Sequence, residues 1–176
     1  HNKTEIIAKL REQKDYIEQL NSKTKSIRIL SLLEIDISPI GILPVPDEAL
    51  DLLDGCLVSI HSNFSMDKET MTKRVLAGLL NPVARIFAHP TGRLLEGREG
   101  YEVNCQPNRL DLPDTLVRLA VKRGVKLSLG TDAHQKEGLQ LMKYGVAVAR
   151  RGWAQKPDII NTWSYDKILS WMHERR

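Results

Sequence analysis

Residue types that bind metal ions stand in or near several stretches that look like buried strands. His61 and His89 each lie at the end of such a stretch, and Asp132 and His134 follow a third in the segment SLGTDAHQKEG. Glu34 lies inside an earlier one. Imidazole nitrogens and carboxylate oxygens together suit Zn²⁺, Mn²⁺ or Fe²⁺. Because such a mixed set can activate water and hold a phosphoryl oxygen, the pattern favours a metal site.

Each of these residues also has an ordinary structural interpretation. A histidine at a strand end can be a hydrogen-bonded loop residue, and Asp132 can start a turn or cap a helix over residues 136–143. Glu34 lies in an apolar stretch, where an unpartnered carboxylate is costly, so we expect it to be ion-paired or metal-bound. Ligand types within or at the ends of four separate strands together favour metal binding over these separate explanations.

The elements that must position these residues alternate between strand and helix. Near-continuous apolar strands in such an order argue for a parallel sheet covered by helices, with active sites at the carboxyl ends of the strands. The same pattern fits an open sheet and a closed barrel. Helices are predicted at residues 2–20, 46–54, 68–80 (with Asp67 as its cap), 113–123 and 165–173, and strands at 27–37, 56–62, 84–89, 101–105, 125–130 and 145–149.

Composition bounds the class of protein. The chain has 176 residues, 41% of them hydrophobic and 27% charged, which is typical of one globular domain. It has no apolar run of about 18 residues and no secretory signal pattern, so we expect a cytoplasmic protein without a membrane partner. The net charge of +4 is compatible with a phosphate-bearing substrate. Cys56 and Cys105 are expected to be buried free thiols.

Six segments resemble a known family and occur in its order. They are LEIDI, SIHSNFSM, AHPTGRLLEGREGY, NCQPNRLDL, GTDAH and KYGVAVARRGW. They closely resemble the PHP (polymerase and histidinol phosphatase) domain, most of all the C-terminal PHP domain of bacterial family X DNA polymerases. The resemblance covers nearly the whole chain from about residue 27. It implies an α/β fold, namely a distorted (β/α)7 TIM-like barrel that binds up to three divalent metals and hydrolyses phosphoesters.

The resemblance also implies roles for individual residues. Glu34 resembles the carboxylate that bridges two metals, and His61 and His89 resemble the remaining protein ligands of one of them. Asp132 would bind the other metal, and His134 the third metal of the family's cluster. These residues form the predicted metal set, in which Glu34 and Asp132 also count as catalytic.

Two arginines beside the predicted site are candidates for binding substrate. Arg93 and Arg109 could each hold a phosphate with two parallel hydrogen bonds. Structural salt bridges are the alternative role for both.

The function that the resemblance implies is a metal-dependent phosphoesterase acting on DNA in repair. It would be a 3′–5′ exonuclease or 3′-end-processing enzyme, with single-stranded DNA or 3′ ends as partner and a polymerase domain in the full-length protein. Two alternatives stay open. One is a non-catalytic PHP module that supports a polymerase domain, and the other is a small-molecule phosphatase of the histidinol-phosphate type.

The sequence departs from the family pattern in two places. The family's opening His-x-His, the Asp after it and a strand ending in TDH are not found within residues 1–176, so only the Glu34, His61 and His89 set would be complete. In the family a helix and the start of a strand lie at the position between Gly100 and Tyr101, which are adjacent in this sequence. A parallel crossover needs about a dozen residues or more, and none are available at this point. We therefore expect residues 1–176 to be a single, partial PHP domain that lacks its first strands and one internal strand–helix segment.

Overall fold

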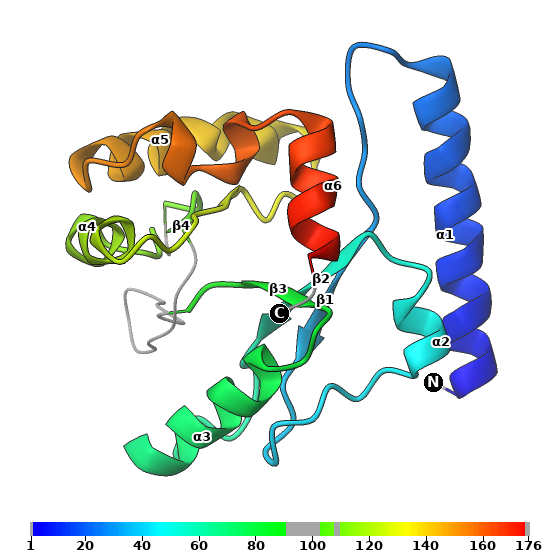
Figure 1. The fold of residues 1–176 in the computed structure, drawn as a ribbon, viewed down its shortest axis with the longest axis horizontal. Helices are drawn as coiled ribbons and strands as arrows, with labels where there is room; N and C mark the ends of the chain where they lie inside the picture. Colours follow the sequence, from blue (N-terminus) through cyan, green and yellow to red (C-terminus); the bar gives the residue numbers. More distant parts are fainter. Residues whose placement is uncertain (1, 91–102, 108–109, 175–176) are drawn as a thin grey trace. The chain divides into compact units, whose positions relative to one another are not determined.

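The computed structural model describes residues 2–90, 103–107 and 110–174, in which helices alternate with strands of two small sheets (Figure 1). The chain divides into two compact units, one of residues 1–86 with 165–176 and one of residues 87–164. The predicted α/β class with parallel strands is confirmed. Closure into a seven-stranded barrel and the single-domain interpretation of residues 1–176 stay predictions.

The first unit is built around a three-stranded sheet in the order β1-β2-β3. β1 and β2 are parallel, with Leu32 opposite Gly55 and Asp36 opposite Ser59. The division between the units falls at the last residue of β3. The elements are α1 (Lys3–Lys23), β1 (Leu32–Asp36), α2 (Asp47–Leu50), β2 (Gly55–Ser59), α3 (Lys68–Leu79), β3 (Ala84–Phe87) and α6 (Tyr165–His173).

Alternation along β1 separates its apolar residues from its acidic ones. Ile35 and, just beyond the strand, Ile37 are buried in the core, whereas the Glu34 side chain is 37% exposed. Successive residues of a strand point to opposite faces, so Glu34 and Asp36 share the other face. We expected Glu34 to have a partner because its carboxylate would be buried in an apolar strand, but the carboxylate is not buried.

α3 packs closely against the end of β1. Its buried residues are Arg74 and Gly78, one helical turn apart. A Cβ atom on Gly78 would lie 2.5 Å from Cδ1 of Ile37, so only glycine permits this approach. At the start of the helix Asp67 accepts hydrogen bonds from the backbone of Glu69 and Thr70, and the predicted cap is confirmed.

A carboxylate also joins β1 and β2 at their amino ends. Oδ2 of Asp54, the residue before β2, accepts a hydrogen bond of 2.7 Å from the backbone N–H of Ser31, the residue before β1. Ser31 is buried, and its own hydroxyl oxygen has no hydrogen-bond partner among the described residues. The Asp54 bond helps to fix the register of the two strands where they begin.

The second unit has a two-stranded parallel sheet in which Val103 lies opposite Leu129. Its core holds the side chains of Cys105, Leu112, Val117, Leu127, Leu129 and Ala149. The elements are β4 (Val103–Asn104), α4 (Asp114–Lys122), β5 (Leu129–Gly130), the 3₁₀ helix η1 (Lys136–Leu141), α5 (Met142–Arg151), and the 3₁₀ helices η2 (Lys156–Asp158) and η3 (Ile160–Thr162).

An asparagine occupies the edge of β5 that faces away from β4. The side-chain oxygen of Asn161 accepts a hydrogen bond of 2.8 Å from the backbone N–H of Leu129, and its side-chain nitrogen donates one of 3.0 Å to the Leu129 carbonyl. On the other side, the Gly130 carbonyl accepts a hydrogen bond from the backbone of Cys105. Both edges of this short strand therefore have hydrogen-bond partners.

The strand predicted at residues 145–149 is wrong, because these residues lie within α5. Their valines and alanines are typical of strands, but Met142, Val146 and Ala149 are spaced by four and three and pack as one helical face on the second core. The helix considered for residues 136–143 is instead η1, and Gln135 rather than Asp132 precedes it.

The remaining predicted elements are present, several of them shorter than expected. The strand predicted at 27–37 is ordered as β1 over Leu32–Asp36, and the last one before the TDAH segment is only Leu129–Gly130. Neither Cys56 nor Cys105 forms a disulfide, and both are buried, as predicted. Burial raises the pKa of the Cys56 thiol to about 11. Among the described residues, no helix is both long and apolar enough to span a lipid bilayer.

Candidate metal centre

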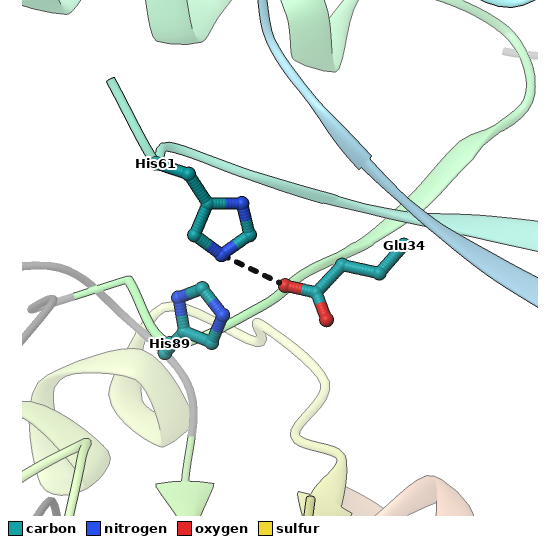
Figure 2. Close-up of side chains that lie close together, drawn as sticks. All are labelled: Glu34, His61 and His89. Atoms are coloured by element: carbon teal, nitrogen blue, oxygen red, sulfur yellow. Dashed lines mark ion pairs between the residues drawn. The ribbon is translucent and has the colours of Figure 1, made fainter. Parts of the chain in front are cut away.

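Three of the predicted ligands form a group, one of them within β1 and the other two just after β2 and β3. Glu34 is on β1, His61 comes two residues after β2, and His89 comes two residues after β3. One carboxylate oxygen and one nitrogen of each imidazole lie within 4.8 Å of one another (Figure 2). Oε1 of Glu34 and Nε2 of His61 are 3.4 Å apart.

The geometry of this trio fits a metal ion. Two ligand atoms that are each about 2.1 Å from a tetrahedral ion lie about 3.4 Å from each other, which is the separation found between Glu34 and His61. The other two pairs of ligand atoms lie within 4.8 Å of each other. Two imidazoles and one carboxylate are also a common ligand set of catalytic zinc sites, which keep one position open.

The three side chains differ in exposure. The Glu34 and His61 side chains are 37% and 53% exposed, whereas His89 is buried. An incoming phosphate ester could therefore approach the ligands from the Glu34 and His61 side. When the imidazole is protonated, His61 and Glu34 form an ion pair.

The residues around His61 hold it from several directions. The Ser59 hydroxyl lies 3.2 Å from Nδ1 of His61. Oδ1 of Asp36 accepts a hydrogen bond of 2.7 Å from the His61 backbone N–H, and its Oδ2 accepts one of 2.9 Å from the Ser62 hydroxyl. The guanidinium of Arg74 lies 3.8 Å from Oδ1 of Asp36 and has no solvent exposure.

Sequence reasoning missed Arg74 and Ser59. A signal for Arg74 was present, because it falls three residues after Met71, on the apolar stripe of the helix predicted at 68–80. A charge on such a stripe indicates a buried partner. No comparable signal marked Ser59, which looks like any other serine in an apolar strand.

Asp132 and His134 lie in the second unit, on the loop after β5. Nδ1 of His134 is 2.9 Å from the Asp132 carbonyl oxygen and 3.8 Å from Oδ1, and the His134 side chain is 86% exposed. Among the described residues, these two do not belong to any group of three ligand-type side chains. Their roles as ligands stay predictions. Arg93 and Arg109 lie outside the described residues.

Backbone strain accompanies two of the predicted ligands. His89 has a φ of +30° and Asp132 a φ of +48°, in a region that non-glycine residues rarely adopt. Asn63, two residues after His61, has a φ of +53°. Such conformations cost about 1–3 kcal/mol each and cluster at functional sites, so their position after strand ends is consistent with the predicted site.

Comparisons with known proteins agree with the resemblance that the motifs indicated. No family model matches the chain. Over 93% of its length the chain is 35% identical to the DNA polymerase/3′–5′ exonuclease PolX of Bacillus subtilis. The predicted resemblance to the PHP domain of family X polymerases is confirmed. The chain spans 32% of the length of the Bacillus protein.

The PHP resemblance extends to a second kind of relative. The chain is 24% identical, over 91% of its length, to probable phosphatases of Thermoanaerobacter sp. strain X514 and Thermoanaerobacter pseudethanolicus, and it covers 74% of each. Exonucleases and phosphatases both hydrolyse phosphate esters. That reaction class therefore unites the relatives of this chain.

Proposed function

We propose that this chain is the metal-dependent phosphoesterase domain of a longer polymerase, and that it hydrolyses DNA phosphoesters as a 3′–5′ exonuclease or 3′-end-processing enzyme in DNA repair. The observation that carries the proposal is the grouping of Glu34, on β1, with His61 and His89, which follow β2 and β3. Similarity to the DNA polymerase/3′–5′ exonuclease of Bacillus supports DNA as the proposed substrate. The fold proposed for the full domain is the distorted (β/α)7 barrel of the PHP type.

The residues present would divide the work in a simple way. Glu34, His61 and His89 would hold a Zn²⁺, Mn²⁺ or Fe²⁺ ion, and their number leaves coordination positions open. The ion supplies a Lewis acid for a phosphoryl oxygen and activates water for attack. The exposed side of Glu34 and His61 would receive the phosphate ester.

Other predicted residues complete the proposal. Asp132 and His134 would bind further metal ions of a cluster of up to three. Arg93 and Arg109 would pair with the phosphate groups of the substrate, since a guanidinium can make two parallel hydrogen bonds to them.

A small-molecule phosphatase is the second candidate function. It is favoured by the similarity to two probable phosphatases, because the chain covers 74% of each of them and only 32% of the polymerase. A phosphatase needs the same metal ligands, so the trio alone does not separate the two candidates. A non-catalytic module that supports a polymerase domain is the third.

Metal analysis and substrate choice test these candidates on the purified chain. We expect bound metal and, with Mn²⁺, release of nucleotides from single-stranded DNA in preference to phosphate release from histidinol phosphate. Glu34→Ala should reduce both metal content and activity, by at least about 100-fold for activity, because it removes a ligand. The matched control is Glu69→Ala, whose exposed carboxylate pairs only with Lys73 in the next turn of α3.

Each candidate has a distinct result. No bound metal in the parent chain contradicts catalysis and supports the supporting-module alternative. Faster hydrolysis of histidinol phosphate than of DNA favours the phosphatase. Equal loss in Glu34→Ala and Glu69→Ala would mean that the effect is not specific to the trio.

A further inference from the structure

The imidazole of His61 has a partner on the side away from Glu34. Nδ1 lies 3.2 Å from the hydroxyl of Ser59, while Nε2 faces the Glu34 carboxylate at 3.4 Å. Ser59 is the last residue of β2 and is fully buried, so its hydroxyl is held by the strand. In metal sites the second ring nitrogen of a histidine ligand usually has such a partner, which fixes the orientation of the ring.

A hydroxyl is suited to this position because it can both donate and accept. With Nε2 carrying its proton beside Glu34, the Ser59 hydroxyl can donate to Nδ1. When Nε2 instead binds an ion, the proton of the neutral ring is on Nδ1, and the oxygen of the same hydroxyl can accept a hydrogen bond from this N–H group. The ring therefore keeps one orientation in both states.

The backbone of His61 is held independently of its ring. Both oxygens of the Asp36 carboxylate are used on this segment, one by the His61 backbone N–H at 2.7 Å and one by the Ser62 hydroxyl at 2.9 Å. Asp36 is the last residue of β1 and lies opposite Ser59 in the sheet. Asp36 and Ser59 thus contact His61 from two adjacent strands, one at its backbone and the other at its ring.

Arg74 ties this support to the body of the unit. Its side chain is 0% exposed, and its guanidinium donates to the backbone carbonyls of Ile37, Ser38 and Ser62. It also lies 3.8 Å from the Asp36 carboxylate. A buried guanidinium is tolerated only with such partners, so its position is narrowly determined.

The opposite end of the same two strands provides an internal comparison. There the Asp54 carboxylate accepts a hydrogen bond of 2.7 Å from the Ser31 backbone N–H, which has the same length as the bond between Asp36 and His61. Both bonds join β1 to β2, but only the second one holds a predicted ligand. The Asp54 bond is therefore what a purely structural role looks like here.

We infer that Ser59 and Asp36 are positioning residues for His61, which hold its ring and its backbone in the orientation that an incoming ion requires. The inference rests on the proposed function, because it takes His61 to be a metal ligand. Pre-organisation of this kind removes the ordering of a ligand side chain from the free energy of binding. Loss of such support typically weakens metal affinity about 10- to 100-fold.

The first test compares two buried serines of the same unit. Co²⁺ affinity is measured by absorption titration of the parent chain, Ser59→Ala and Ser31→Ala. We expect Ser59→Ala to weaken binding at least about tenfold and to alter the Co²⁺ spectrum, because a less fixed ring changes the ligand field. Ser31→Ala should bind as the parent does, since the Ser31 hydroxyl has no hydrogen-bond partner within the part of the chain that the structure describes. Equal affinities for the parent and Ser59→Ala overturn the inference and leave the proposed function intact.

The second test uses the two aspartates and needs no metal. Hydrogen exchange of the backbone amides is followed by NMR in metal-free Asp36→Ala and Asp54→Ala. We expect the His61 amide to exchange at least about tenfold faster in Asp36→Ala only, and the Ser31 amide to do so in Asp54→Ala only. An unchanged His61 amide in Asp36→Ala contradicts the role of Asp36 in holding the backbone.

A parent chain that binds no Co²⁺ contradicts the proposed function, and the inference is then decided by NMR alone. In the metal-free chain, changed or broadened imidazole signals of His61 in Ser59→Ala, but not in Ser31→Ala, support the positioning role. Identical imidazole signals in all three proteins overturn it. The two failures are therefore distinguishable.

Discussion

The ends of β2 and β5 both carry a histidine predicted to bind metal, but they are built differently. After β2, His61 is held by Ser59 and Asp36, which come from two adjacent strands. After β5, the described contacts of His134 go only to Asp132, two residues away, and its side chain is 86% exposed. The position of His61 is therefore fixed by contacts with two strands, whereas that of His134 depends on contacts within its own loop.

This difference bears on how each histidine could bind an ion. Ordering a mobile side chain on binding costs about 0.5–1.5 kcal/mol, which His61 largely avoids and His134 does not. Around β5 the side-chain hydrogen bonds go to the strand, through Asn161, and to the residue that follows it, where Gln106 donates a hydrogen bond of 2.6 Å to the Thr131 carbonyl. A ligand on such a loop needs partners beyond its own neighbours before it can bind tightly.

The largest expected effect concerns the arginine behind the His61 loop. Arg74→Met should destabilise the chain by about 3–5 kcal/mol, because it leaves the carbonyls of Ile37 and Ser62 without that donor and the Asp36 carboxylate without its cationic partner. The control Arg151→Met removes an exposed ion pair with Asp114 and should cost about 0–1 kcal/mol. Urea unfolding followed by circular dichroism measures both. Similar losses would mean that the His61 end has no special support.

The next effect separates the two histidines directly. His61→Ala should lower Co²⁺ affinity by more than about 100-fold, beyond the effect of a residue that only supports a ligand. His134→Ala should change the Co²⁺ affinity of the site formed by Glu34, His61 and His89 by less than about threefold, because His134 is proposed to bind a different ion of the cluster. The control His173→Ala, which alters an exposed histidine at the end of α6, should also change it by less than about threefold. If His134→Ala weakens binding as much as His61→Ala, support by neighbouring side chains does not decide which loop binds the ion.

The smallest effect concerns the start of α3, the helix that carries Arg74. Hydrogen bonds from the side chain and backbone of Thr70 hold the pKa of Asp67 below its ordinary value. Because the folded-state pKa is depressed, the stabilisation is present above the unfolded-state pKa and is lost as the pH falls through the folded-state value. Asp67→Asn should therefore lower the Tm slightly at neutral pH, and the difference should vanish in acid.

Calorimetry across pH measures the Asp67 effect. Asp15→Asn serves as the control, since Asp15 is exposed in the middle of α1 and caps no helix. A larger loss of Tm in acid than at neutral pH for Asp67→Asn would contradict the sign of the effect.

Local signals in the sequence were sufficient for most elements of the fold. The helix at residues 165–173 and the cap at Asp67 follow from spacing and capping chemistry, and both are found as predicted. The strand predicted at 145–149 is wrong because a short run of valine and alanine fits a strand or one face of a helix equally well. Only the position of the second core, which residues distant in the chain create, decides between them.

The candidate site was predictable in its ligands but not in its support. Residue types at strand ends are visible in the sequence, and parallel strands bring such ends together. The contacts of Ser59 and Arg74 depend on side-chain directions and on how closely α3 approaches β1, which no spacing rule gives. Asp132, His134, Arg93 and Arg109 remain predictions from the family resemblance.

The hydrogen bonds of Asn161 have a consequence for self-association of the chain. An open strand edge offers unpaired N–H and C=O groups to any other extended chain, and such edges nucleate aggregation. In β5 the groups of Leu129 that would be offered are already taken by one side-chain amide. A single residue from another segment thus blocks the template, as a neighbouring strand would do in a larger sheet. Replacing Asn161 with alanine would leave the N–H and C=O groups of Leu129 open to pairing with another chain, without changing any predicted ligand.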